Sequence, residues 1–391
     1  MTEPTPGHGP STELVTGATG LVGMERLVYR LERGWPTVAL RRVGSDVGRV
    51  EAFLRERFGE EFGTAWSKLE WREADLSDVV ALEEAMEGCH RVFHAAGRVS
   101  FRPGDEDQLK AVNAIGTANV VNAALASGIQ RFVHISSVAA LGRSSVNPET
   151  GDRLPVSERS DWAEGAGASP YGVSKHAGEM EVWRGVAEGL AAFSVNPTVI
   201  LGDARYAESS GLIYRRAAKG SRFHPVGGNG YIGVADVVAV VAALDDAVDQ
   251  GREEILGERF VVSAEDVLHR DVMTWAAEGL GVQGPTRPLT GWMLGLAWRA
   301  AGLAGLLTGR PPALTRDLAR NTQSVHRYDT SKLRAALPDF RFVPVRTSSG
   351  RPRRGALIDQ FHWLFLAKES RWACTSSRRG GRISGWLYHQ S

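Results

Sequence analysis

The chain has 391 residues, a formal net charge of +1 at pH 7 and a hydrophobic content of 43%. These values are typical of a soluble globular protein and give no electrostatic reason to expect a nucleic-acid partner. The two cysteines, Cys89 and Cys374, are too few for a disulfide framework or a metal cluster, and the polar N-terminus lacks the pattern of a signal peptide. We therefore expect a cytoplasmic protein without a metal site.

Short β-branched runs alternate with longer amphipathic stretches in the first half of the chain. They predict six strands, at Glu13–Thr16, Thr37–Arg41, Lys68–Arg72, Arg91–His94, Arg131–Ile135 and Ala192–Asn196. Five helices are predicted between them, at Val22–Glu32, Val47–Phe58, Val79–Glu87, Gln108–Ser127 and Tyr171–Gly189. This alternation predicts an α/β fold, namely a Rossmann-type doubly wound parallel sheet with helices on both faces.

A glycine-rich turn, Thr16-Gly17-Ala18-Thr19-Gly20-Leu21-Val22-Gly23, follows the first predicted strand and leads into a helix. This order places backbone N–H groups and the positive helix end around a pyrophosphate, and glycine permits the close approach. A structural turn without a ligand would have the same sequence. We expect a dinucleotide to be held by Gly17, Thr19, Gly20, Leu21, Val22 and Gly23.

The end of the second strand carries Arg41 and Arg42, at the place where an NAD site has Asp or Glu. A guanidinium group suits a 2′-phosphate and cannot replace a carboxylate that binds the ribose hydroxyls. The alternative is that both arginines are solvated loop charges. The pattern therefore favours NADP over NAD.

The segment Ser169-Pro170-Tyr171-Gly172-Val173-Ser174-Lys175 brings a phenol and an ammonium group to one helix face, because residues four apart share a face. We expect Lys175 to lower the pKa of Tyr171 and so make it a general acid/base at neutral pH. By itself the spacing also fits a solvated helix face.

The glycine turn and the Tyr-Lys helix together resemble the extended short-chain dehydrogenase/reductases of the NAD(P)-dependent epimerase/dehydratase superfamily. The resemblance implies that Ser137 hydrogen-bonds a substrate carbonyl, with Ser136 as the competing assignment. It implies that Asn113 holds a helix bend and a proton-relay water, although a buried asparagine satisfied by the backbone would look identical. The remaining cofactor contacts that it implies are Asp75 and Leu76 at the adenine, Ala95, Ala96 and Gly97 at the same sheet edge, and Asn196 and Pro197 at the nicotinamide. A proline that only terminates the strand would look the same as Pro197.

The alternation ends near Gly202, which predicts a cofactor domain at 1–202, a smaller substrate lobe at 203–345 and an Arg/Ser/Gly-rich tail at 346–391. Within the lobe, residues 231–238 look like the family's strand and helix that return to the first domain, with Asp236 as a helix cap. We expect the tail to be poorly packed, apart from one short helix around Leu357–Leu366. A nucleic-acid or membrane-surface arm and a non-native translation product are its alternatives.

Two features bear on the reaction. Val199 stands where sugar-nucleotide members keep an Asn, and the segment 196–202 is instead similar to dihydroflavonol-reductase-like and 3β-hydroxysteroid-dehydrogenase-like members. The apolar segment Leu289–Leu307 predicts an apolar cleft, although a core helix would look the same and membrane contact is a third interpretation.

We therefore expect an NADP-linked carbonyl reductase or alcohol dehydrogenase that acts on an apolar carbonyl or alcohol. A nucleotide-sugar epimerase/dehydratase is the alternative enzyme, and an NADP-binding redox sensor without turnover is the alternative from another class. The family resemblance also implies a homodimer.

Overall fold

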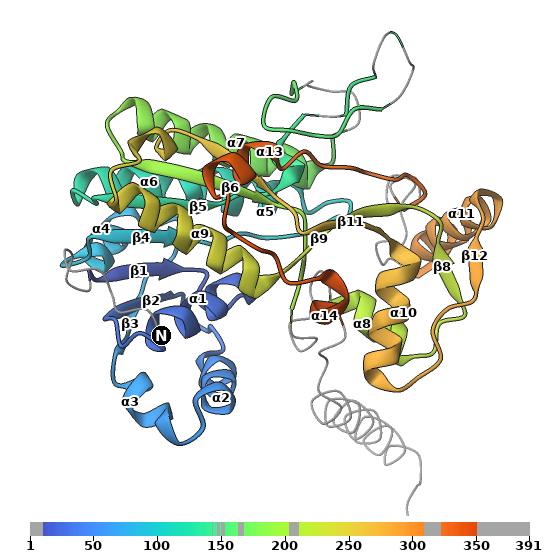
Figure 1. Cartoon of the computed structure of the whole chain (residues 1–391), viewed down its shortest axis with the longest axis horizontal. Coiled ribbons are helices and arrows are strands. Elements are labelled where there is room, and N and C mark those ends of the chain that lie inside the picture. Colours follow the sequence, from blue (N-terminus) through green and yellow to red (C-terminus); the bar gives the residue numbers. More distant parts are fainter. Residues whose placement is uncertain are drawn as a thin grey trace, which may run out of the picture.

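The computed structural model describes residues 11–142, 144–146, 149, 153–162, 168–202, 211–308 and 322–349. Its larger part is a seven-stranded sheet in the order β10-β6-β5-β4-β1-β2-β3, in which all neighbouring strands are parallel (Figure 1). The strands are β1 Glu13–Thr16, β2 Thr37–Arg41, β3 Leu69–Glu73, β4 Arg91–His94, β5 Arg131–Ile135, β6 Ala192–Pro197 and β10 Arg259–Val262. This order confirms the predicted Rossmann-type fold.

Helices cover both faces of this sheet because successive strand residues point to opposite sides. Leu14 packs in one buried apolar cluster and its neighbour Val15 packs in the other. The helices of this part are α1 Leu21–Leu31, α2 Val47–Phe58, α3 Phe62–Trp66, α4 Val79–Met86, α5 Glu106–Leu109, α6 Gly116–Ala126, α7 Pro170–Ala187 and α9 Val234–Asp249. Shorter turns are the 3-10 helices η1 Gly59–Glu61, η3 Val138–Ala140 and η4 Glu253–Ile255 and the π-helix η2 Lys110–Ile115.

The strand that returns to the main sheet differs from the prediction. Residues 228–233 form β9 (Gly228–Gly233), which pairs with β7 (Val199–Leu201) and β11 (Glu265–Leu268) in a separate three-stranded sheet. The strand that joins the main sheet is β10, which the sequence analysis missed. Only the helix part of the prediction is met, because α9 packs against α1 over the sheet.

Asp236 is not the helix cap that was predicted. The N-cap of α9 is Gly233, and Asp236 lies in the first helical turn. Its Oδ2 accepts a hydrogen bond from the Val343 backbone N–H at 2.9 Å, and burial raises the pKa of this carboxyl group. The residue therefore ties α9 to the segment around Val343.

The smaller lobe lies beside the sheet in Figure 1 and contains α8, α10 and α11. The helices of the lobe are α8 Gly211–Ala218, α10 His269–Leu280, α11 Gly291–Thr308 and α14 Val345–Ser349, and two further strands are β8 Phe223–Pro225 and β12 Arg287–Leu289. The apolar segment 289–307 is thus mainly helical, as α11. In the part of the chain that the structure describes, no helix is long and apolar enough to cross a membrane.

Two stretches assigned to the lobe or tail belong elsewhere. Helix α13 (Ser331–Ala336) packs on β10, and its Leu333 joins the main core. Helix α14 buries Val345 completely and contacts α10, while Arg346 pairs with Glu278 at 3.2 Å. The boundary predicted after Val345 therefore cuts a helix; residues 350–391, with the helix expected at 357–366, lie outside the described residues.

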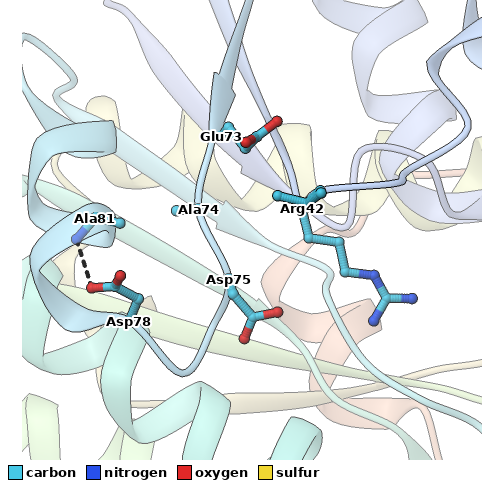
Figure 2. A pocket seen from close by; sticks show the side chains of 7 residues that line it. Arg42, Glu73, Ala74, Asp75, Asp78 and Ala81 are labelled. Carbon is cyan, nitrogen blue, oxygen red and sulfur yellow. Dashed lines mark hydrogen bonds between the residues drawn. The ribbon is translucent and has the colours of Figure 1, made fainter.

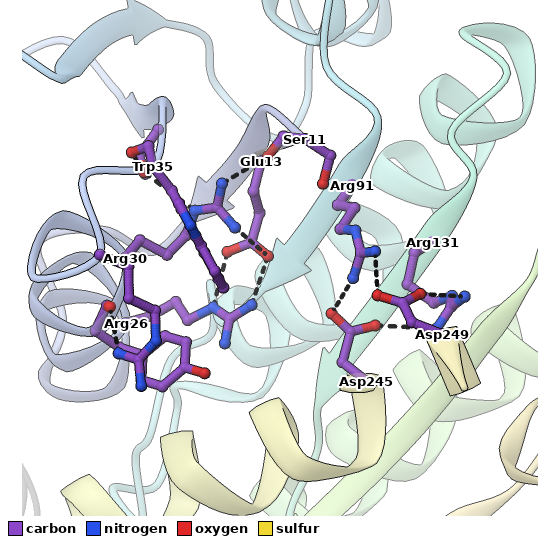
Figure 3. Close-up of polar contacts among 12 residues, drawn as sticks. Ser11, Glu13, Arg26, Arg30, Trp35, Arg91, Arg131, Asp245 and Asp249 are labelled. Carbon is purple, nitrogen blue, oxygen red and sulfur yellow. Dashed lines mark hydrogen bonds and ion pairs between the residues drawn. The ribbon is translucent and has the colours of Figure 1, made fainter. Parts of the chain in front are cut away.

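Ion pairs hold α1 and α9 against the amino edge of the sheet, where its strands begin (Figure 3). Glu13 of β1 is fully buried between two arginines of α1, and it lies 2.6 Å from Arg26 and 3.5 Å from Arg30. The neighbouring strands contribute Arg91 and Arg131, which pair with Asp245 and Asp249 of α9. The strands begin at this amino edge and end at the opposite, carboxyl edge of the sheet. The candidate site lies at the carboxyl edge.

Candidate active site

The glycine turn between β1 and α1 forms an open phosphate cradle. Gly17 has φ +66°, and a Cβ there would lie 2.6 Å from the Ala96 backbone nitrogen. A Cβ on Gly23 would lie 2.1 Å from the Gly17 carbonyl oxygen, so α1 can approach the turn only without a side chain at that position. Gly20, which is exposed, is the N-cap of α1, and no side chain of the described residues caps the helix. The first N–H groups of α1 are therefore left to bind an anion.

The other residues predicted in this turn support its shape. Thr19 is half-buried, and Val22 packs against the main core. The Leu21 side chain faces Gly202, where a Cβ would lie 2.5 Å from its Cδ1. The turn thus fits a dinucleotide pyrophosphate and contacts the start of the lobe.

A pocket of about 310 Å³ lies where β2 and β3 end, and it is lined by Arg42, Val43, Glu73, Ala74, Asp75, Asp78 and Ala81 (Figure 2). Arg41 is paired with Glu73 at 3.2 Å on the surface, so its guanidinium group is partly engaged. Asp75 accepts hydrogen bonds from the hydroxyl and the backbone N–H of Ser77, and these bonds lower the pKa of Asp75. Arg42 and Asp75 therefore line the same pocket, whereas Arg41 pairs with Glu73 on the surface.

A buried hydrogen-bonded chain connects β1 with the helix that carries Asn113. Thr117 donates to the Asn113 carbonyl oxygen at 2.8 Å, so its oxygen accepts from His94 Nε2 at 3.0 Å. His94 Nδ1 must then accept from the Thr16 hydroxyl at 2.7 Å, and Thr16 Oγ1 accepts from the Ala96 backbone N–H. The neutral tautomer of His94 with its proton on Nε2 satisfies every one of these bonds. Burial together with Lys175 lowers the pKa of His94 to about 3.

Asn113 lies in the π-helix η2, which interrupts the predicted helix. Its side-chain amide donates to the Arg98 carbonyl oxygen at 2.9 Å and to Ser174 Oγ at 2.9 Å, and its oxygen accepts from the Arg98 N–H at 2.7 Å. These contacts correspond to the alternative of a buried asparagine satisfied largely by backbone. A Cβ on Gly97 would lie 3.3 Å from this amide oxygen and 3.9 Å from Lys175 Nζ, so the loop after β4 passes close to both groups.

Tyr171, Lys175 and Ser137 come together at the carboxyl edge of the sheet. The Ser137 hydroxyl acts on the Tyr171 phenol and favours a lower pKa for it, whereas the Ser136 hydroxyl is buried and donates to Glu179. Ser136 is thus engaged elsewhere, and the substrate contact of Ser137 stays a prediction. Lys175 is buried, with its Nζ donating to the Ile135 carbonyl oxygen at 2.9 Å.

The predicted effect of Lys175 on Tyr171 differs from what is found. Burial raises the pKa of Tyr171, and only the Ser137 hydrogen bond opposes the rise. Burial also lowers the pKa of Lys175 to about 8, with Glu179 acting in the opposite direction. The reason is that desolvation disfavours the charged form of each group, the phenolate of Tyr171 and the ammonium of Lys175. Tyr171 therefore holds its proton at neutral pH.

The sequence analysis missed Glu179 as a site residue. It follows Lys175 by one helical turn and is fully buried, where it accepts from Ser136 and from Asn196 and pairs with Arg259 at 3.0 Å. The sequence signal for Glu179 was its spacing, because residues four apart, here Lys175 and Glu179, share one helix face. Glu179 thus joins α7, β5, β6 and β10 beneath the reacting groups.

Asn196 and Pro197 lie at the end of β6. The Asn196 side chain has no exposed surface, and its amide nitrogen donates to the Ser137 carbonyl oxygen at 3.1 Å. Pro197 is also buried. Asn196 therefore positions the backbone of Ser137, and the contact of the two residues with a nicotinamide stays a prediction.

Four further residues complete the site. Leu76 packs against Gly116, where a Cβ would approach it to 3.1 Å, and Ala95 lies against Gly17 and the main core. Phe101, which the sequence analysis did not single out, is half exposed and packs edge-on against the Tyr171 ring at 5.6 Å. Val199 packs in the lobe core near Tyr231. No group of residues suited to hold a metal ion is found within the described ranges.

Comparison with known proteins gives consistent relatives. Residues 13–262 match the model of the NAD dependent epimerase/dehydratase family. A sterol demethylase protein B of Methylococcus capsulatus is 31% identical over 69% of this chain and 75% of its own length. A putative dihydroflavonol 4-reductase of Synechocystis is 27% identical over 90% of this chain and 93% of its own. A UDP-glucuronic acid 4-epimerase from Bacillus cereus in complex with NAD, 16% identical, shares the fold with a TM-score of 0.62 over 87% of this chain and 97% of that one.

Proposed function

Since this chain belongs to the NAD-dependent epimerase/dehydratase family, we propose that it is an NADP-linked reductase of apolar carbonyl compounds. It is an NAD(P)-dependent oxidoreductase of the extended short-chain dehydrogenase/reductase type. The observation that carries the finer proposal is the placement of Tyr171 and Lys175 four residues apart on α7, with the Lys175 Nζ bonded to the Ile135 carbonyl oxygen at the end of β5, the sheet edge to which the glycine turn also belongs.

A bound nicotinamide would supply the hydride, and the protein would supply orientation and a proton. Tyr171 would donate that proton to a carbonyl oxygen, since its phenol is neutral at pH 7. Ser137 orients the phenol and offers a second hydroxyl to the same oxygen. Lys175 lies close to Gly97, and its ammonium group would bind a ribose hydroxyl there.

The preference for NADP rests on Arg42. Arg41 is paired with Glu73, so it is Arg42 that remains to bind a 2′-phosphate in the pocket at the ends of β2 and β3. A carboxylate would be needed there to bind the ribose diol of NAD, and among the described residues the acids that line this pocket are Glu73, Asp75 and Asp78. Glu73 and Asp75 are engaged by Arg41 and Ser77, and Asp78 caps α4.

The preference for an apolar carbonyl rests on two features. Phe101 presents an exposed aromatic ring beside Tyr171, which suits a flat or apolar substrate. Val199, the position where sugar-nucleotide enzymes place an amide, offers no hydrogen-bonding group. The relatives named as a sterol demethylase and a dihydroflavonol 4-reductase agree with this choice.

The decisive experiment is a thermal-shift screen followed by turnover assays. NADPH with aromatic or alicyclic ketones and aldehydes should stabilise the protein and be consumed, whereas UDP- and dTDP-sugars should not stabilise it. Tyr171→Phe should abolish turnover while NADPH binding stays near the wild-type value. Strong stabilisation by a nucleotide sugar alone would support epimerase chemistry, and near-normal turnover by Tyr171→Phe would remove the assigned proton donor.

A further inference from the structure

Two segments of the lobe, 211–231 and 281–308, contain no Asp or Glu, although the whole chain has 45 of them. The same segments contain six basic residues: Arg215, Arg216, Lys219, Arg222, Arg287 and Arg299. Five of these, all except Arg215, are exposed. A surface built from these segments is therefore positive, although the protein as a whole is close to neutral.

The two segments are neighbours in space. Strand β8 pairs in parallel with β12, which places Phe223 opposite Arg287. The Arg222 carbonyl oxygen accepts from the N–H groups of both Thr286 and Arg287. Helix α11 begins two residues after β12 ends, and Figure 1 shows β8, β12 and α11 together at the end of the lobe that is remote from the main sheet. We call Arg222, Phe223, Arg287, Trp292, Leu296 and Arg299 the lobe-end face.

The exposed stripe of α11 is apolar as well as basic. Trp292 is 69% exposed and Leu296 is 60% exposed, and one helical turn separates them. Arg299 follows on the same side and is exposed, whereas Leu294 on the opposite side is buried. Large apolar side chains with this much exposure beside arginines are typical of helices that lie in the plane of a membrane interface.

We infer that the lobe-end face docks on an anionic lipid surface, with Trp292, Leu296 and Phe223 entering the interface and the arginines contacting lipid phosphates. A second copy of this chain suits the face less well, because a two-fold contact would bring arginine against arginine. A nucleic acid would use the arginines and leave Leu296 without a partner. Vesicle binding requires neither NADPH nor a substrate, so it does not depend on which carbonyl the enzyme reduces.

The test is co-sedimentation of the full chain with vesicles of phosphatidylcholine alone and of equal parts phosphatidylcholine and phosphatidylglycerol. We expect binding to the mixed vesicles and little to phosphatidylcholine, with weaker binding in roughly 0.5 M salt, where the Debye length is only a few ångströms. Trp292→Ser with Leu296→Ser should reduce the affinity about tenfold or more, and Arg222→Gln with Arg287→Gln should remove most of its salt dependence.

The matched control is Val80→Ser with Val343→Ser, which removes two exposed apolar side chains outside this face and should leave vesicle binding unchanged. The melting temperature of each variant is measured in parallel to show that it is folded. Failure of the wild type to bind mixed vesicles, or equal binding by the Trp292/Leu296 variant, overturns the inference. So does a change of oligomeric state in that variant by analytical ultracentrifugation, which would make the face a contact between copies.

Discussion

Glu179→Gln should separate the support of the site from its chemistry. The substitution keeps the shape of the side chain but removes the charge that faces Arg259 and accepts from Ser136 and Asn196. Breaking a buried ion pair costs about 3 to 5 kcal/mol. The Arg259 side chain is 23% exposed and can gain water, so we expect the free energy of unfolding to fall by about 2 to 3 kcal/mol.

The Glu179→Gln substitution should also lower the pKa of Lys175. Two unit charges one helical turn apart, at roughly 6 Å, interact by about 3 kcal/mol at an effective dielectric constant of about 20. Since one pKa unit is about 1.4 kcal/mol, removing this attraction lowers the pKa of Lys175 by up to about 2 units. The wild-type value is about 8, and burial is its main cause. The ammonium form is present below the pKa and is lost above it, so cofactor binding should weaken at a lower pH in the variant.

The assay is NADP⁺ affinity by calorimetry or protein fluorescence from pH 5.5 to pH 9.5, together with the melting temperature. The wild-type affinity should fall as the pH rises through about 8. For Glu179→Gln the fall should come about one to two units earlier. The control is Glu181→Gln, since Glu181 lies on the same helix but pairs with Arg184 at the surface and should change neither reading. Superimposable pH profiles for the wild type and Glu179→Gln would refute the role given to Glu179.

Three further results are expected. Arg42→Ala should weaken NADPH binding about 10- to 100-fold, by the loss of a charge-assisted contact of about 1.5 to 3 kcal/mol, and leave NADH binding unchanged; equal wild-type affinities for both cofactors would contradict this. Gly17→Ala should abolish cofactor binding, whereas Gly34→Ala, with the same φ of +66° but nothing within 4 Å of its Cβ, should only lower stability by about 1 to 2 kcal/mol. A chain ending at Ser349 should keep the melting temperature of the full protein, whereas one ending at Pro344 should lose about 1.5 to 3 kcal/mol because Val345 is fully buried; equal melting curves for the two would show that α14 contributes nothing.

The cofactor half of the fold was predictable because its signals are local. The six predicted strands are short β-branched runs between turn residues, and each lies within two residues of an observed strand at both ends. Strand β10 was missed because its four residues, Arg259–Val262, make a strand only by pairing with β6, and no local pattern states that partner. Likewise, the helix predicted at Gln108–Ser127 is interrupted by the π-helix η2, which leaves the apolar periodicity almost unchanged.

The candidate site was likewise predictable where its signals are local, and not where they depend on packing. Tyr171, Lys175 and Ser137 could be named because a helix face and a strand end bring them together, and the structure places them so. The roles of Asn113 and Asn196 could not be read, because an amide bonded to backbone and an amide open to a ligand have the same sequence. The pKa of Tyr171 was predicted in the wrong direction because burial depends on the elements that cover the residue, and the sequence does not show them.

The position of β10 has a consequence for the biogenesis of the protein. During synthesis the six preceding strands leave the ribosome well before residues 259–262, so β6 is a sheet edge for that interval. Every residue of β6 is buried in the finished protein, and an apolar edge of this kind is a template for pairing with other chains. A gene fragment that stops near residue 202, where the alternating pattern ends, would leave this edge permanently open. We expect such a fragment to collect in inclusion bodies, whereas chains that extend past β10 and α13 close the edge and stay dispersed.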